Sequence, residues 1–139
     1  MKKAMVFGTF DILHEGHLYL FSEAKKFGNY LIVVVGRDKT VKKIKGRNPQ
    51  NNENIRLENV AKISLVDKAV LGDIEDQYKV LEKYKPDIIC LGYDQKSFIT
   101  ENLEKEIEKR GIKTKIVNIG PYREDIYKSS KMKEQGDRV

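Results

Sequence analysis

The amino-acid sequence predicts an α/β fold, a parallel five-stranded sheet with helices on both faces. Apolar runs recur at near-regular intervals and are separated by amphipathic stretches, which is the pattern of successive βα units. The run at residues 30–35 is continuously apolar and largely β-branched, as expected for a strand that is covered on both sides. Doubly wound, Rossmann-like sheets of this kind have the strand order 3-2-1-4-5, and we expect that order here.

Each element is expected from its own residue pattern. Strands are expected at residues 4–7, 30–35, 66–71, 87–91 and 112–119. Helices with apolar residues at helical spacing are expected at residues 16–27, 54–65, 75–84 and 99–110. Three of these helices meet a stop signal, at Gly28-Asn29, Lys85-Pro86 and Gly111. Residues 36–54 are cation-rich without a strong period, so we expect either a solvated loop or a mobile flap there.

The composition is typical of one globular domain, residues 1–139, with a frayed end at residues 135–139. No apolar run approaches the ~20 residues of a membrane span, and the N-terminus lacks the apolar region of a signal peptide. We therefore expect a cytoplasmic protein without a membrane partner. The single cysteine, Cys90, lies in the apolar run 88–91, which favours a buried structural thiol over a catalytic one.

The chain is basic, with 27 lysines and arginines against 21 aspartates and glutamates and a net charge of +6. This balance favours anionic partners, and nucleotides and nucleic acids are both candidates. No helix-turn-helix, zinc-finger or RNA-recognition signature accompanies the charge. A nucleic-acid-binding module without catalysis is therefore the less favoured hypothesis, and we expect no nucleic-acid partner.

The stretch MVFGTFDILHEGH at residues 5–17 carries the strongest functional signal. It reads as a strand, a glycine turn and a helix start, which presents backbone N–H groups and the positive end of a helix dipole to phosphate. The only two histidines, His14 and His17, lie three residues apart at that helix start. They could be surface residues or metal ligands, but Cys90 is distant and no H-x-x-x-H pair occurs. Imidazoles that bind a phosphoryl group are the favoured interpretation.

A second loop is expected to face this stretch. Gly92-Tyr93-Asp94-Gln95 follows the fourth strand. In an open parallel sheet, ligands bind at the carboxyl ends of the strands beside the point where the strand order reverses, and the first and fourth strands flank that point. A plain turn is the alternative, but the location favours a ligand contact.

These residues also carry a resemblance to a known family. Gly8-Thr9-Phe10-Asp11 followed by His14-Glu15-Gly16-His17 resembles the signature of the cytidylyltransferase-like nucleotidyltransferases. A second motif, R-T-E-G-I-S-T-T-K in glycerol-3-phosphate cytidylyltransferases, has its counterpart at residues 123–131, REDIYKSSK. The arginine, an acidic residue, the Ser129-Ser130 pair and the final lysine are kept, whereas Ile126 replaces the glycine and Lys128 the first serine.

The resemblance implies transfer of a nucleoside monophosphate from a nucleoside triphosphate to a phosphomonoester, with release of pyrophosphate. The catalytic residues would be His17, on the α-phosphate in the transition state, and His14, on the same phosphate or its bridging oxygen. The nucleotide-binding residues would be Gly8, Thr9, Phe10, Asp11, Glu15, Gly16, Lys43, Asp94, Tyr122, Arg123, Ser129 and Ser130. The substrate-binding residues would be Asp11, Arg56 and Tyr93.

Two of these assignments keep alternatives. Lys42, Lys43 or Lys45 could each reach the β- and γ-phosphates, and Lys43 is the favourite. Arg56 lies off the apolar stripe of its predicted helix, so an exposed arginine without function competes equally with a place near the nucleotide.

The resemblance also implies the cofactor, the partners and the reaction. A divalent cation, Mg²⁺, would be carried on the β- and γ-phosphates without dedicated protein ligands, and the protein would be a homodimer. LGYDQ at residues 91–95 and RDKTVKKIKGR at residues 37–47 look most similar to the archaeal-type FAD synthases, which implies ATP and FMN as substrates. The alternative is a cytidylyltransferase acting on glycerol 3-phosphate or another small phosphorylated alcohol.

Overall fold

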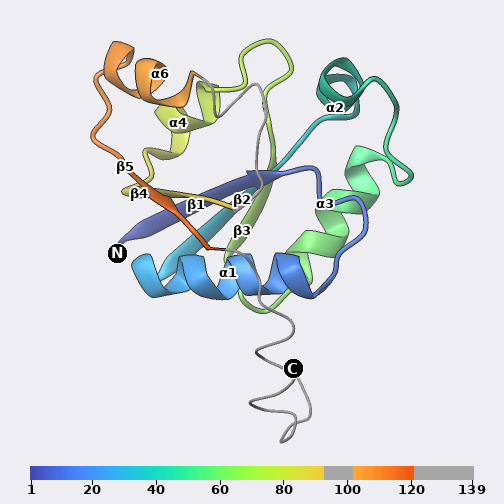
Figure 1. Cartoon of the computed structure of the whole chain (residues 1–139), viewed down its shortest axis with the longest axis horizontal. Coiled ribbons are helices and arrows are strands. Elements are labelled where there is room, and N and C mark those ends of the chain that lie inside the picture. Colours follow the sequence, from blue (N-terminus) through green and yellow to red (C-terminus); the bar gives the residue numbers. More distant parts are fainter. Residues whose placement is uncertain (93–101, 121–139) are drawn as a thin grey trace, which may run out of the picture.

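The computed structural model describes residues 1–92 and 102–120, and its centre is a parallel sheet of five strands (Figure 1). The strands lie in the order β3-β2-β1-β4-β5, which confirms the predicted fold class and strand order. Their bounds are Lys3–Gly8 for β1, Tyr30–Val35 for β2, Lys68–Leu71 for β3, Ile88–Leu91 for β4 and Lys115–Asn118 for β5.

The central strand is β1, which pairs with β2 along its whole length, from Lys3 opposite Tyr30 to Gly8 opposite Val35. On its other side it pairs with β4, where Ala4 lies opposite Ile88. Because all pairs are parallel, the carboxyl ends of the strands meet at one edge of the sheet. The residues that follow β1 therefore lie between those that follow β2 and β4.

Helices cover both faces of the sheet, as predicted. Their bounds are Glu15–Phe27 for α1, Asp38–Lys45 for α2, Glu53–Ala61 for α3, Lys79–Tyr84 for α4 and Leu103–Lys109 for α6. Side chains alternate along β1, so Val6 packs with Phe21 of α1 and Val60 of α3, while Met5 packs with Leu81 of α4 and Ile107 of α6. Each fully buried side chain of this size stabilises the fold by about 2 kcal/mol.

The observed helices differ from the predicted ones in three places, one of which is α3, which ends at Ala61 and not at residue 65. Residues 36–54 are not a continuous loop, because α2 forms within them and ends at Gly46, whose φ of 80° is in the left-handed region. The helix expected at residues 75–84 begins only at Lys79. No helix within the described ranges combines the length and the apolar character needed to cross a bilayer.

Candidate active site

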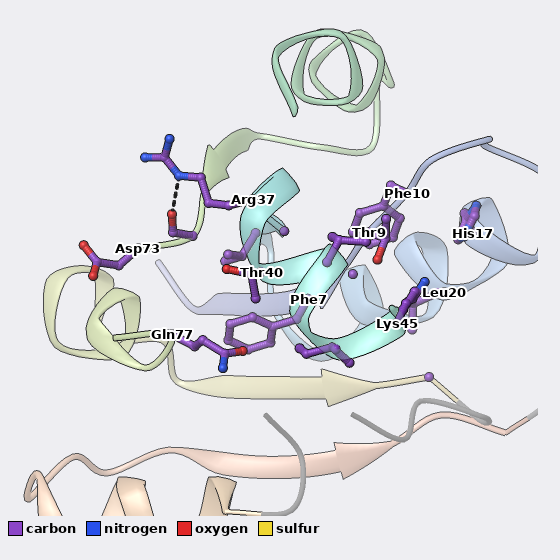
Figure 2. Close-up of a pocket in the computed structure, with 17 residues that line it drawn as sticks. Phe7, Thr9, Phe10, His17, Leu20, Arg37, Thr40, Lys45, Asp73 and Gln77 are labelled. Atoms are coloured by element: carbon purple, nitrogen blue, oxygen red, sulfur yellow. Dashed lines mark hydrogen bonds between the residues drawn. The ribbon is translucent and has the colours of Figure 1, made fainter. Parts of the chain in front are cut away.

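A cavity of about 380 Å³ opens at the carboxyl edge of the sheet (Figure 2). Gly8 ends β1, and Gly36, Gly72 and Gly92 each follow the last residue of β2, β3 and β4. All four glycines line the cavity. Much of its floor is therefore backbone, which lets a ligand approach the peptide groups closely.

The turn after β1 depends on one glycine. Phe10 has a φ of 52°, uncommon for a residue with a side chain, and its ring is nearly fully buried. A Cβ atom on Gly8 would lie 2.6 Å from Cζ of that ring, so no other residue fits there without a rearrangement. The ring in turn packs at 5.2 Å, edge to face, against the imidazole of His17. Gly8 and Phe10 thus fix the turn beside the histidine pair.

His14 and His17 begin α1 and cap it. Nδ1 of His14 accepts a hydrogen bond from the backbone N–H of Gly16 at 3.0 Å, and Nδ1 of His17 accepts one from the backbone N–H of His14 at 3.3 Å. The two rings stack with their centroids 4.0 Å apart. Since each Nδ1 is an acceptor, each neutral imidazole must carry its proton on Nε2. The pair therefore combines two Nε2–H donors with the positive end of α1, an arrangement suited to an anion.

Gly16 lies close to the same cap. A Cβ atom at this position would lie 2.9 Å from Cε1 of His14, so any other residue would require the exposed imidazole to shift. Glu15 is the first residue of α1 and is exposed, and it is not in the wall of the cavity. Of the predicted nucleotide contacts in this loop, Gly8, Thr9 and Phe10 do line the cavity.

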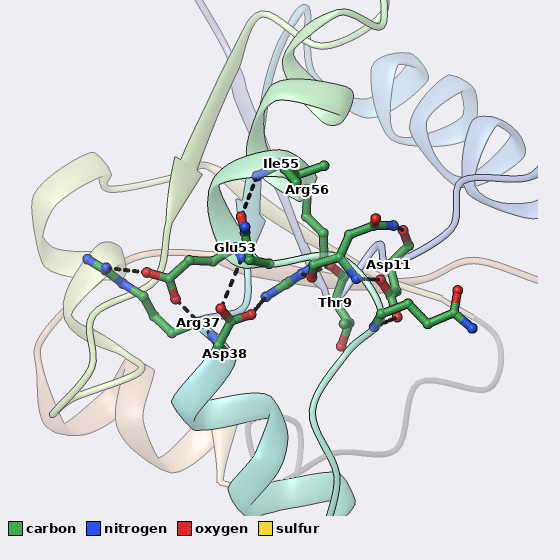
Figure 3. Close-up of polar contacts among 10 residues, drawn as sticks. Thr9, Asp11, Arg37, Asp38, Glu53, Ile55 and Arg56 are labelled. Atoms are coloured by element: carbon green, nitrogen blue, oxygen red, sulfur yellow. Dashed lines mark hydrogen bonds and ion pairs between the residues drawn. The ribbon is translucent and has the colours of Figure 1, made fainter.

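The Asp11 carboxylate holds the loop to the segment before α3 (Figure 3). It accepts hydrogen bonds from the backbone N–H groups of Gln50 and Asn51 at 2.7 and 2.8 Å. Burial acts to raise the pKa of Asp11, but these two bonds and the charge of Arg56 outweigh it and lower the pKa below its usual value. The carboxylate is thus ionised and engaged within the protein, and its predicted contact with a nucleotide or substrate stays a prediction.

Arg56 is fully buried, with an exposed fraction of 0%, so the expectation of an exposed side chain is wrong. Its Nη1 donates to the carbonyl of Thr9 at 2.8 Å, its Nη2 pairs with Asp38 at 2.7 Å, and its Nε donates to the carbonyl of Asn51 at 2.9 Å. Three of the five N–H groups of its guanidinium thus donate within the protein, and the predicted substrate contact stays a prediction. Arg56 fixes the carbonyl of the loop that follows β1.

The N-termini of α2 and α3 are joined beside Arg56 (Figure 3). The backbone N–H of Asp38 donates to the Glu53 carboxylate at 2.8 Å, and the backbone N–H of Glu53 donates to the Asp38 carboxylate at 3.2 Å. Arg37 pairs with Glu53 at 3.1 Å. Each carboxylate thereby satisfies a free N–H at the start of the other helix. This contact places α2 over the cavity.

The face of α2 that meets the cavity carries Thr40, Val41, Ile44 and Lys45. Lys43 is exposed and is not in the cavity wall, whereas Lys45 is. The choice of Lys43 as the phosphate contact is therefore not supported by the helix register, which favours Lys45. Sequence reasoning could not settle this because it did not expect a helix here.

The remaining predicted residues cannot be placed. Tyr93, Asp94, Tyr122, Arg123, Ser129 and Ser130 lie outside the described residues. Gly92, which precedes two of them, does line the cavity opposite the turn after β1, as the crevice hypothesis expects. Sequence reasoning missed three residues that line the cavity: Thr40, which lies within the 37–47 segment but was not singled out, and Asp73 and Gln77, which belong to no motif. Among the residues described, no group of three or more His, Cys, Asp or Glu could hold a metal ion.

Comparison with known proteins agrees with this geometry. The cytidylyltransferase-like family model matches residues 5–135. The FAD synthase of Aciduliprofundum boonei is 49% identical over 122 residues, which are 88% of this chain and 80% of that protein. The FAD synthase of Thermoplasma volcanium is 43% identical over 135 residues, 97% of this chain and 94% of that protein.

Solved structures agree as well. The crystal structure of the lipopolysaccharide core biosynthesis protein from Thermoplasma volcanium has a TM-score of 0.82 at 46% identity, covering 88% of this chain and 99% of that one. Pantothenate synthetase from Thermus thermophilus, at 14% identity, shares the fold with a TM-score of 0.61 over 91% of this chain and 58% of that one. From its motif, its fold and its relatives, this chain belongs to the cytidylyltransferase-like family, in the group that includes the archaeal FAD synthases, and is a nucleotidyltransferase.

Proposed function

We propose that this nucleotidyltransferase is an FAD synthase that converts ATP and FMN to FAD and pyrophosphate. The observation that carries the proposal is its 40–50% identity to five FAD synthases over at least 86% of its length. In the reaction, a phosphate oxygen of FMN forms a bond to the α-phosphorus of ATP. The bond from that phosphorus to its bridging oxygen breaks, and pyrophosphate leaves with the electron pair.

The reaction depends on substrate binding and charge stabilisation more than on proton transfer. The attacking phosphate is already ionised at neutral pH, so no general base is needed, and the barrier falls when two anions are held together and the charge on the transferring group is stabilised. The Nε2–H groups of His14 and His17 would donate to oxygens of the α-phosphate. Lys45, in the cavity wall, would neutralise the β- and γ-phosphates.

The donor set is consistent with a metal carried by the nucleotide. The phosphate end of the cavity presents the imidazole of His17 and the ammonium of Lys45, with His14 and the N-terminus of α1 beside His17, and the described residues include no acidic cluster that would hold a cation independently. Mg²⁺ would then be bound by the β- and γ-phosphates and would stabilise the leaving pyrophosphate. A homodimer is the expected assembly, and light scattering of the purified protein would test it.

The decisive experiment measures pyrophosphate release with Mg²⁺ while ATP and CTP are each combined with FMN and with glycerol 3-phosphate. Release only with ATP and FMN, together with the appearance of FAD, would support the proposal. Release with CTP and glycerol 3-phosphate would replace it by the cytidylyltransferase alternative. The same assay on His17→Ala identifies release that comes from a contaminating enzyme.

A further inference from the structure

The cavity has two chemically different ends (Figure 2). His17 and Lys45 lie at one end, which suits phosphate. Asp73 and Gln77 lie at the other, beyond the ends of β2 and β3, and the ring of Phe7 lies between the two ends. Phe7 and Val34 are both buried apolar residues in the cavity wall. An anion-binding end, an apolar middle and a polar rim match a ligand that has a phosphate at one end and a heterocycle at the other.

The geometry of in-line displacement indicates which substrate binds at the far end of the cavity, the end that carries Asp73 and Gln77. The attacking and leaving oxygens lie on opposite sides of the α-phosphorus, so the two substrates extend from the histidines in different directions. Apart from the lysine of α2, which lies at the phosphate end of the cavity, the predicted nucleotide motifs follow β1, β4 and β5. The end of the cavity over β2 and β3 is therefore left for the acceptor.

We propose that the isoalloxazine ring of FMN lies over Gly72 at this far end and that the Gln77 amide recognises the pyrimidine edge of the ring. This inference rests on the proposed function, because it assigns the acceptor subsite of that reaction. A ribityl chain would span the apolar middle and bring the phosphate to the histidines. A small phosphorylated alcohol would reach only the phosphate end and would leave the far end unfilled.

Gly72 is suited to this role because none of its neighbouring atoms requires a glycine at this position. A Cβ atom there would lie 3.6 Å from Cγ1 of Val34 and 3.9 Å from the carbonyl of Val35, which are ordinary contacts. Protein packing therefore does not require a glycine at this position, in contrast to Gly8. The carbonyl of Gly72 is fixed by a 2.8 Å hydrogen bond from Nε of Arg37. Gly72 itself is buried, and the result is a fixed backbone segment in the cavity wall against which a planar ring can lie.

Gln77 supplies the polar recognition. Within residues 1–92 and 102–120, its side-chain amide has no hydrogen-bond partner, and it lines the cavity next to Phe7. The amide offers one acceptor and an N–H donor, the complement of a ring N–H beside a ring carbonyl. The neighbouring Asp73 carboxylate is held by the backbone N–H groups of Glu75 and Asp76 at 3.1 and 2.8 Å, which stabilises the turn that carries Gln77.

The test compares three variants in the FAD-forming assay. Gly72→Ala adds a methyl group beside Val34 in the cavity wall against which the ring would lie, and Gln77→Leu removes the hydrogen bonds while keeping a similar volume. Each should raise the KM for FMN by about tenfold and leave the KM for ATP within about twofold of the wild type. Gly120→Ala is the matched control, since Gly120 also follows a parallel strand but is not in the cavity wall, and an added Cβ atom meets nothing within 4 Å among the described residues.

The outcomes separate this inference from the proposed function. If the wild type makes no FAD, the proposed function fails. If the wild type makes FAD but Gly72→Ala and Gln77→Leu keep its KM for FMN, or raise the KM for ATP instead, the acceptor subsite is wrongly placed. Titration of FMN fluorescence with each variant gives a second readout that does not depend on turnover, and circular dichroism confirms that each variant is folded.

Discussion

The guanidinium of Arg56 donates a 2.8 Å hydrogen bond to the carbonyl of Thr9, 47 residues earlier in the chain. The first turn of α3 is thereby tied to the loop that presents the backbone to phosphate. The same guanidinium pairs with Asp38 of α2, whose carboxylate is 37% exposed. One buried side chain thus connects three segments that surround the phosphate end of the cavity.

Replacing Arg56 by Met should lower the free energy of unfolding by about 3 kcal/mol, because it leaves the carbonyls of Thr9 and Asn51 and the Asp38 carboxylate without their donor. Urea denaturation measures the change. The control is Lys25→Gln, which breaks a partly exposed pair with Asp67 and should cost less than about 1 kcal/mol. Equal costs for the two variants would contradict the central position given to Arg56.

Replacing His14 by Asn should separate the contribution of His14 to the N-terminal cap of α1 from its contribution to catalysis. The Asn side-chain oxygen can accept the N–H of Gly16 as Nδ1 does, so stability should stay within about 0.5 kcal/mol, whereas His14→Ala should lose about 1 kcal/mol. Both variants lack the Nε2–H donor and should lose about 100-fold in turnover. An active His14→Asn enzyme would mean that the imidazole serves the helix alone.

Replacing His17 by Ala should reduce turnover by at least ~100-fold, the scale of a lost donor to the transition state. The fold should persist, since most of α1 is held by buried residues such as Phe21 and Ala24. Single-turnover pyrophosphate release measures the rate, and near-UV circular dichroism tests the packing. If His17→Ala turned over as fast as the wild type, the proposed catalytic role of this motif would be contradicted.

Lys45→Met and Lys43→Met form a matched pair on α2. Loss of a charged contact with the triphosphate should lower kcat/KM for ATP by about 10-fold or more for Lys45→Met. Lys43→Met should stay within about twofold, because the Lys43 side chain is not in the cavity wall. The reverse ranking would show that α2 shifts its register when the nucleotide binds.

The Cys90 thiol should make the protein less stable in alkali. Burial raises the pKa of Cys90 from 9.0 to about 11, so at intermediate pH the folded protein keeps a proton that the unfolded chain has lost. The free energy of unfolding should therefore fall as the pH rises through this window, by at most about 1.4 kcal/mol per pH unit. Urea denaturation at several pH values measures the slope, and Cys90→Ala should abolish this contribution.

The order of the strands followed from the sequence because each apolar run is long enough to be recognised locally. Five runs with intervening amphipathic segments leave few arrangements open, and the motif after the first run indicated the functional edge of the sheet. The helix α2 could not be found in this way. It has eight residues with Val41 as its only fully buried side chain, and its start is satisfied by Glu53, fifteen residues later.

The roles of individual side chains were harder to predict because they depend on specific hydrogen bonds and not on the apolar pattern. Arg56 lies off the apolar stripe of its helix, and only its distant acceptors, Thr9 and Asp38, explain why it is buried. His14 is an unusual N-cap residue, since propensity favours Ser, Thr, Asp and Asn. Specific hydrogen bonds decided both cases, long-range ones for Arg56 and local ones for His14, and hydrophobic periodicity contains no information about them.

The cavity floor, made largely of backbone after four strands, has a consequence for how such an enzyme can diversify. Gly8, Gly36, Gly72 and Gly92 contribute no side chains to the contact with a substrate, so substrate preference is left to the rim, on α2 and on the turn after β3. Rim residues can be exchanged without disturbing the packing beneath the sheet. New acceptors are therefore accessible by few substitutions, at little risk to folding.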